Sequence, residues 1–201
     1  MKLTLGISLL LSCGAALSMA VEPSATLFEN DQVKVVRALE KAHVKGSFHE
    51  HKTNRVMVYL QAGRQQFDYQ DGRKTATFDW HAGQVVFSKP EGMHSPEVVS
   101  DNAFNIIEIE LRKPGAEKKL SKVDKKHVTV EFENAQVRVL RVKLAAHEKS
   151  AMRGETDAVA IYLTDTPGHK MGEAVWEPAG PGVEENKGDQ PLEMIRVELK
   201  S

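Results

Sequence analysis

The chain contains two copies of one sequence pattern, and this duplication limits the folds that it can adopt. Four segments of the first copy recur in the same order in the second copy: residues 28–37 and 132–141, 58–60 and 161–163, 90–92 and 178–180, and 107–112 and 195–200. Chance is a poor explanation for four ordered matches, because self-similarity of this kind marks repeated structural units. We therefore expect two domain-like units built on one plan.

Each copy has the pattern of short β-strands. Residues 33–37 and 56–60 are rich in β-branched side chains, as strands are. Asp71-Gly72, between residues 66–69 and 75–78, is a strong signal for a β-hairpin. Beyond the N-terminal segment, no stretch has a long apolar period of the helical kind. The sequence thus predicts an all-β fold, with a sandwich or barrel in each copy.

The second copy is shorter in its middle. Leu60 and Ser88 lie 28 positions apart, whereas their counterparts Leu163 and Trp176 lie 13 positions apart. The Asp-Gly hairpin is the part that the second copy lacks. We expect a smaller or partly open second barrel, whose edges need cover from the first because uncovered strand edges invite aggregation.

The first 20 residues resemble a secretory signal. Lys2 provides a positive start, residues 3–11 are apolar, and small side chains precede an expected cleavage after Ala20. The mature protein is then expected in the periplasm or outside the cell. Processing as a lipoprotein at Cys13 is the less well matched alternative. Because Cys13 is the only cysteine, cleavage after Ala20 leaves no disulfide and no thiolate ligand.

The rest of the chain divides by composition and by the repeat. We expect a first domain at residues 26–112, a linker at 113–124 and a second domain at 125–200. The linker contains Pro114 and Gly115 and is rich in lysine, as solvated tethers are. A net charge of −1 leaves no clustered basic excess for a nucleic acid. We also expect no membrane span in the mature chain.

The first copy carries three histidines in a pattern suited to a metal site. His49 and His51 lie two positions apart, so in a strand their side chains point to the same face. His94 follows Pro90 and Gly92, on what is expected to be a neighbouring strand. Three neutral imidazoles from two strands suit Fe, Mn, Zn, Ni or Cu and leave positions open for water or substrate. The alternative is a degenerate barrel whose histidines are only half-buried.

These segments resemble the two sequence motifs of the cupin superfamily. The parts similar to the first motif are residues 46–51, 56–60 and Gly63, and those similar to the second are Gly83, Pro90, Gly92 and His94. In cupins the first motif supplies two histidines and usually a glutamate, and the second supplies one histidine. The resemblance implies a bicupin, with two tandem cupin-type barrels of the double-stranded β-helix or jelly-roll kind. It also implies that His49, His51 and His94 are metal ligands.

Arg55 stands where a cupin usually has its glutamate. Arginine stays protonated and cannot ligate a metal, so the implied site has three histidines and no carboxylate. Arg55 shares strand parity with Met57 and Tyr59. If these side chains point inward, Arg55 would clamp a carboxylate or phosphate of a ligand, and Tyr59 would hydrogen-bond the same ligand. An arginine at a strand edge facing water is the alternative.

The second copy lacks all three of these histidines. Their positions are held by Met152, Gly154 and Gly182, so we expect a degenerate second domain with a structural role. The remaining histidines show no ligand spacing and are expected in loops or at the surface: His43, His81, His127, His147 and His169.

Two functions are consistent with these residues. One is a binding or accessory protein that holds a small ligand, anionic if Arg55 faces it, beside the metal site. The other is a mononuclear metal-dependent oxygenase of a small carboxylate-bearing substrate, because some iron-binding cupin dioxygenases use three histidines. The missing glutamate and the lack of an evident general base favour the first, although fold alone does not choose. A monomer or a homodimer is expected.

Overall fold

The computed structural model describes residues 24–151 and 154–201. The expected signal segment with Cys13 and Ala20 lies outside these ranges, as does Met152. The regular elements of the described part are all β-strands. The described part contains no helix that is long and apolar enough to cross a membrane. The prediction of an all-β fold is confirmed.

The front barrel, formed by strands β1 to β9, consists of two β-sheets. Its strands are β1 (Ala25–Glu29), β2 (Val33–Glu40), β3 (His49–His51), β4 (Arg55–Tyr59), β5 (Gly63–Tyr69), β6 (Ala76–Trp80), β7 (Gln84–Ser88), β8 (Glu91–Val98) and β9 (Phe104–Leu111). One sheet has the order β1-β2-β9-β4-β7, and the other has the order β3-β8-β5-β6. β5 and β6 form the predicted hairpin, and Gly72 in its turn has a positive φ of 85°.

The back barrel, formed by strands β10 to β16, is smaller. Its strands are β10 (Val128–Glu133), β11 (Val137–Leu144), β12 (Lys149–Ala151), β13 (Ala158–Tyr162), β14 (Ala174–Glu177), β15 (Val183–Glu185) and β16 (Leu192–Leu199). Its five-stranded sheet, β10-β11-β16-β13-β14, repeats that of the front barrel. Opposite it lies only the pair β12-β15, so the counterpart of the β5–β6 hairpin is absent from the described chain, as the shorter second copy predicts.

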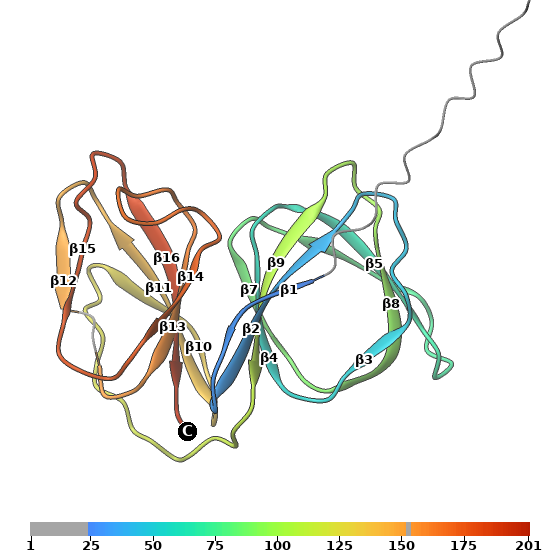
Figure 1. Cartoon of the computed structure of the whole chain (residues 1–201), viewed down its shortest axis with the longest axis horizontal. Coiled ribbons are helices and arrows are strands. Elements are labelled where there is room, and N and C mark those ends of the chain that lie inside the picture. The colour runs from blue at the N-terminus through green and yellow to red at the C-terminus, as the bar shows by residue number, and fades with distance from the viewer. Residues whose placement is uncertain (1–23, 152–153) are drawn as a thin grey trace, which may run out of the picture.

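The two barrels pack through the outer faces of their five-stranded sheets. On β9, Ile107 and Ile109 join a core shared by both barrels, whereas Ile106 packs inside the front barrel. Val139 and Val197 of the back barrel belong to the same shared core. Figure 1 shows these sheets next to each other at the centre, with β3 and β8 on one outer side and β12 and β15 on the other. The sequence led us to expect that the front barrel covers the strand edges of the back barrel. The front barrel instead covers a face of the back barrel's five-stranded sheet, because the central strands are apolar on both sides.

Two matching hydrogen bonds cross this interface. Nη2 of Arg37 donates to the carbonyl of Gly172 at 2.6 Å, and Nη2 of Arg141 donates to the carbonyl of Gly83 at 2.6 Å. Arg37 and Arg141 are equivalent in the repeat, so the interface has approximate two-fold symmetry. Both glycines have a positive φ, 75° for Gly83 and 82° for Gly172, and most side chains disfavour that backbone conformation.

We expect Gly172→Ala to lower the free energy of unfolding by about 1–2 kcal/mol, since an alanine is strained at positive φ. A Cβ at Gly172 would also lie 2.7 Å from Cδ1 of Leu60 across the interface. Gly168→Ala is the matched control, because a Cβ there meets nothing within 4 Å. Urea unfolding of the two variants tests the prediction, and an equal loss of stability in both would contradict it.

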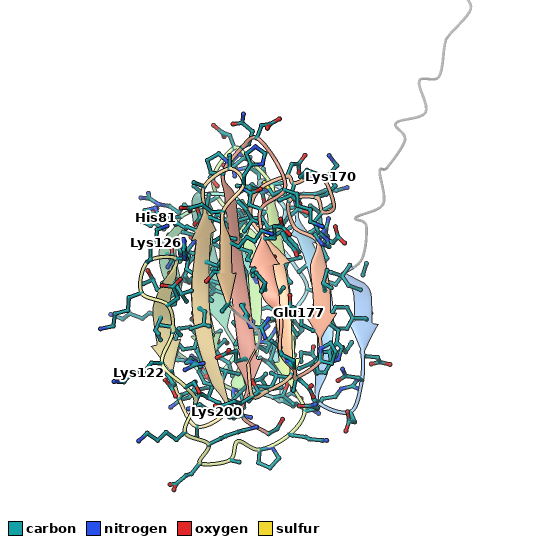
Figure 2. All side chains as sticks on the ribbon, turned by 90° about the vertical axis from the view of Figure 1, so that its left-hand side faces the viewer. His81, Lys122, Lys126, Lys170, Glu177 and Lys200 are labelled. Carbon is teal, nitrogen blue, oxygen red and sulfur yellow. The ribbon has the colours of Figure 1, made fainter. Side chains whose placement is uncertain are left out.

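Ion pairs lie buried in the back barrel. Nε of Arg138 donates to Glu198 at 2.5 Å, and Arg196 pairs with Glu177. All four side chains are almost completely buried. In Figure 2, Glu177 lies among the strands of this barrel, whereas three labelled lysines lie at its rim: Lys122, Lys126 and Lys170. Paired charges thus occupy the interior of the barrel that lacks the three histidines.

One histidine outside the cluster is buried, although the sequence led us to expect it at the surface. His127 is 9% exposed, and its Nδ1 lies 2.5 Å from a carboxylate oxygen of Asp124. Nε2 of the same ring lies 3.5 Å from Glu148. Asp124 therefore holds the buried ring by a hydrogen bond and Glu148 lies near its other nitrogen, which is consistent with a structural role.

Candidate metal centre

Three histidines of the front barrel meet where β3 pairs with β8. His49 lies directly opposite His94 in the antiparallel register, and a register shift follows before His51. One ring nitrogen from each residue lies within 4.8 Å of the other two. Within the described residues, no other group of three or more His, Cys, Asp or Glu side chains comes close enough to hold one ion. The structure thus brings together the three histidines that the sequence singled out.

In two of the three imidazole rings, a hydrogen bond to the backbone determines which nitrogen keeps a free lone pair. Nδ1 of His49 lies 2.9 Å from the carbonyl oxygen of Ser47, and Nδ1 of His94 lies 2.9 Å from that of Gly92. A carbonyl only accepts, so each Nδ1 carries the proton and donates, and Nε2 keeps its lone pair. Metal-bound histidines in proteins usually donate their other N–H in this way. The local backbone therefore leaves Nε2 of His49 and Nε2 of His94 available to an ion.

His51 is held differently. Nη1 of Arg55 donates to Nε2 of His51 at 2.8 Å, so this lone pair already has a partner. Burial, together with the charge of Arg55, lowers the pKa of His51 to about 3, and the ring is therefore neutral at neutral pH. Neutral imidazole is the form that binds metals. An ion that uses Nε2 of His51 would have to displace the hydrogen bond from Arg55.

Arg55 lies inside the barrel and is balanced by a carboxylate. It is only 3% exposed, so it does not face water from a strand edge. Its Nη1 also donates to Glu108 at 2.8 Å, and its Nη2 donates to Ser88 at 3.1 Å. Glu108 neutralises the guanidinium, as a buried arginine requires. The sequence analysis missed Glu108, although an acidic residue in the apolar strand that follows His94 was a usable signal.

Tyr59 is buried and shapes the barrel wall. Its ring stacks on Trp80 with centroids 4.3 Å apart and an interplanar angle of 13°. Its hydroxyl donates to Oε1 of Gln65 at 3.3 Å, an oxygen that also accepts from Nε1 of Trp80 at 2.9 Å. Burial raises the pKa of Tyr59, so the phenol stays protonated. The hydroxyl is therefore engaged with Gln65, and Tyr59 contributes mainly its ring.

Two cavities flank the histidines. The acidic cavity, of about 420 Å³, lies between β2 and β3 and is lined by His49, His51, Glu40, Glu108 and Glu110 among others. The aromatic cavity, of about 240 Å³, lies between β6 and β7. Its lining includes Arg55, Phe67, Phe78, Trp80 and His94. The cluster thus borders one cavity that contains three glutamates and another that is lined by aromatic rings.

Glu40 provides a titratable group in the acidic cavity that the sequence analysis missed. Nε2 of Gln65 donates to its carboxylate at 2.5 Å. Burial, followed by repulsion from Glu108, raises the pKa of Glu40 to about 7. A carboxyl with such a pKa can accept or give up a proton near neutral pH, which is the property of a general base.

Glu40→Gln is expected to reduce the pH dependence of stability between about pH 4.5 and about pH 7. The pKa of the Glu40 carboxyl is about 7 in the folded chain, above the ordinary value of 4.5, so folding favours the protonated form. Its contribution to stability is therefore full below about pH 4.5 and is lost as the pH rises through about 7. The predicted loss is about 2–3 kcal/mol.

Urea unfolding at several pH values measures this loss. Glu117→Gln, in the exposed linker, is the control and should keep the unmodified chain's slope of stability against pH. The prediction fails if the Glu40→Gln variant shows that slope as well.

Comparisons with known proteins identify the fold. No protein-family model matches this sequence, and no curated protein matches it. Among solved structures, AerE from Microcystis aeruginosa has a TM-score of 0.57 at 12% identity, over 89% of this chain and 98% of that one. A cupin 2 conserved barrel domain protein from Leptotrichia buccalis has a TM-score of 0.53 at 13% identity, over 88% of each chain.

Oxalate decarboxylase from Bacillus subtilis is a further structural neighbour. One of its variants has a TM-score of 0.61 at 12% identity, over 87% of this chain and 71% of that one. Such identities establish a shared fold and nothing further. The chain is therefore a cupin-fold protein with two tandem barrels, as the sequence predicted. In this chain the second barrel is reduced, and the histidine cluster lies in the first.

Proposed function

We propose that the front barrel binds a divalent transition metal ion, Fe, Mn, Zn or Ni, through His49, His51 and His94, beside a small organic ligand. The observation that carries this proposal is the cluster itself, with three imidazole nitrogens within 4.8 Å of one another. Oxalate decarboxylase from Bacillus subtilis, one of the structural neighbours, has Mn(II) centres, which supports a metal in a barrel of this fold. A bound metal would supply Lewis acidity toward an oxygen of the ligand.

The surrounding residues have separate tasks in this proposal. The carbonyls of Ser47 and Gly92 orient His49 and His94. Arg55 releases Nε2 of His51 and keeps its ion pair with Glu108, so its charge stays balanced. Arg55 then binds the ligand from one side, and the ring of Tyr59 limits the space behind it. The back barrel stabilises the front barrel through the shared core.

Removal of a ligand residue tests the metal centre. Calorimetric titration of the untagged chain is expected to show one metal ion per chain. His94→Ala is expected to weaken binding at least 100-fold, since disturbing even the residues that orient a ligand costs about 10–100-fold. His81→Ala is the control, because His81 is exposed on the loop after β6. Metal binding that His94→Ala leaves unchanged, in a variant that still folds, would refute the site.

A mononuclear oxygenase of a small carboxylate-bearing substrate is the second candidate. Glu40 favours it, because a carboxyl with a pKa of about 7 beside His49 and His51 supplies the general base that the sequence motif lacks. Oxygen uptake by the iron-loaded chain with small carboxylates tests this candidate. Oxygen uptake that requires both the substrate and Glu40 would support the oxygenase. If no carboxylate causes uptake, the oxygenase is refuted and the proposal of a ligand-binding protein stands.

We also propose export to the periplasm or beyond, with cleavage after Ala20, and action as a monomer or homodimer. The sequence of residues 1–20 supports the export proposal. Mass spectrometry of the protein recovered outside the cytoplasm is expected to find a chain that begins at Val21. Recovery of the uncleaved chain alone would contradict it.

A further inference from the structure

The aromatic cavity has a continuous wall of rings that leads to the histidine cluster. Phe78 and Trp80 on β6 are nearly parallel, with centroids 5.6 Å apart. Phe67 on β5 meets Phe78 edge to face at 5.8 Å, and it also lies 5.8 Å from the ring of His94. Phe78 is 42% exposed, so this part of the wall is open to solvent. The wall thus runs from an open side of the barrel to the ligand residue His94.

A buried donor at the inner end of this cavity lacks a partner. Arg55 lines the cavity and is 3% exposed. Its Nη1 and Nη2 donate to His51, Glu108 and Ser88, but its Nε finds no hydrogen-bond partner among the described residues. Buried donors are rarely left unsatisfied, and an exception calls for an explanation such as a water or a bound molecule. The cavity therefore combines an aromatic wall with a buried guanidinium that has one unsatisfied N–H.

The charge around the cluster favours an acid at this end. Three imidazoles are neutral ligands, and Arg55 and Glu108 balance each other. A divalent ion held by the histidines would add positive charge beside the aromatic cavity, where the one carboxylate in the lining, that of Glu91, is already paired with Arg73. A carboxylate both neutralises such a charge and accepts hydrogen bonds from a guanidinium.

The size of the cavity limits the ligand. Cavities that hold drug-sized molecules are about 300–1,000 Å³. The aromatic cavity, at about 240 Å³, is below this range. A single substituted ring therefore suits it better than a larger polycyclic molecule.

We propose that the aromatic cavity binds an aromatic carboxylate of one ring, with the ring against Phe78 and Trp80 and the carboxylate between Arg55 and His94. The placement of the carboxylate depends on the proposed function, because it requires the metal centre. The placement of the ring depends only on the cavity. Aromatic rings gain from offset or edge contacts with such a wall beyond what apolar burial alone provides.

The two tryptophans of the chain make a direct test available. Trp80 lies in the cavity wall, whereas Trp176 packs against the core shared by the barrels. A Trp176→Phe background leaves Trp80 as the only tryptophan. Its fluorescence can then be titrated with benzoate, in metal-free and in metal-loaded protein. Cyclohexanecarboxylate matches the charge without the ring, and benzamide matches the ring without the charge.

Benzoate is expected to quench Trp80 saturably and to bind about tenfold more tightly than cyclohexanecarboxylate. Metal loading is expected to tighten benzoate binding and to leave benzamide binding unchanged. In the same background, Phe78→Ala is expected to weaken benzoate binding about tenfold. Phe48→Ala, which removes a ring of similar exposure outside the cavity lining, is the control and should bind benzoate normally.

The outcomes separate this inference from the proposed metal centre, because metal binding is measured independently in every variant. A chain that binds metal but shows no saturable benzoate quenching overturns the inference and leaves the metal centre standing. A chain that prefers benzoate to cyclohexanecarboxylate but binds no metal supports the ring site and refutes the metal centre. Equal binding of the two acids overturns the aromatic class of ligand.

Discussion

Ile109→Asp is expected to abolish the folded state of both barrels. Ile109 has no exposed surface and belongs to the core in which the two five-stranded sheets pack together. An ionised carboxylate placed there would have no partner, and burial of an unpaired charge costs several kcal/mol at least. A typical domain is stable by only about 5–15 kcal/mol, so such a cost removes most or all of the stability.

Circular dichroism and urea unfolding measure this effect, and two controls calibrate it. Ile109→Val keeps the site apolar and is expected to cost about 0.5–1.5 kcal/mol. Thr129→Asp adds the same charge at an exposed position of β10 and should change little. The barrels share one core, so we expect them to unfold in a single transition. Loss of the front barrel alone, with the back barrel still folded, would show that the shared core is not what couples them.

Glu108→Gln is expected to lower the free energy of unfolding by about 3–5 kcal/mol, because it leaves the buried Arg55 without its counter-charge. The pair lies 2.8 Å apart, with side chains 4% and 11% exposed, so little water is available to replace the carboxylate. Glu110→Gln removes the same charge two residues along β9 and is the matched control. A comparable loss in both variants would mean that the ion pair is not the cause.

A double substitution separates the pair from its individual members. Replacement of Arg55 by methionine together with Glu108 by leucine removes both charges and should recover much of the stability lost in Glu108→Gln, because buried pairs can often be exchanged for apolar residues. The coupling energy from the full cycle measures the interaction itself. Additive effects of the single substitutions would show that the two residues act independently.

The duplication, the strands and the histidine pattern could all be predicted from the sequence. Alternation with a period of two, the Asp71-Gly72 turn and the missing hairpin of the second copy are local features, and local features determine strands and turns. The same alternation predicted that His49 and His51 share a face, and His94 lies opposite His49 in the sheet. The cupin fold follows from these patterns and agrees with the structural neighbours.

The surroundings of the cluster could not be predicted, because they depend on strands far apart in the chain. Arg55 and Glu108 are separated by 53 positions and meet only because β4 pairs with β9 in one particular register. Glu40 acquires its raised pKa from burial and from Glu108, neither of which its neighbours in the sequence reveal.

The sequence by itself determined that this chain forms two β-barrels and that only the first carries three histidines in a ligand pattern. The tertiary structure alone decided that the barrels pack face to face and that Arg55 is buried against Glu108 and His51. It also decided that an acidic and an aromatic cavity lie on either side of the histidines. The physical reason is that a strand's own pattern specifies which side chains share a face, whereas sheet register and packing specify what that face meets.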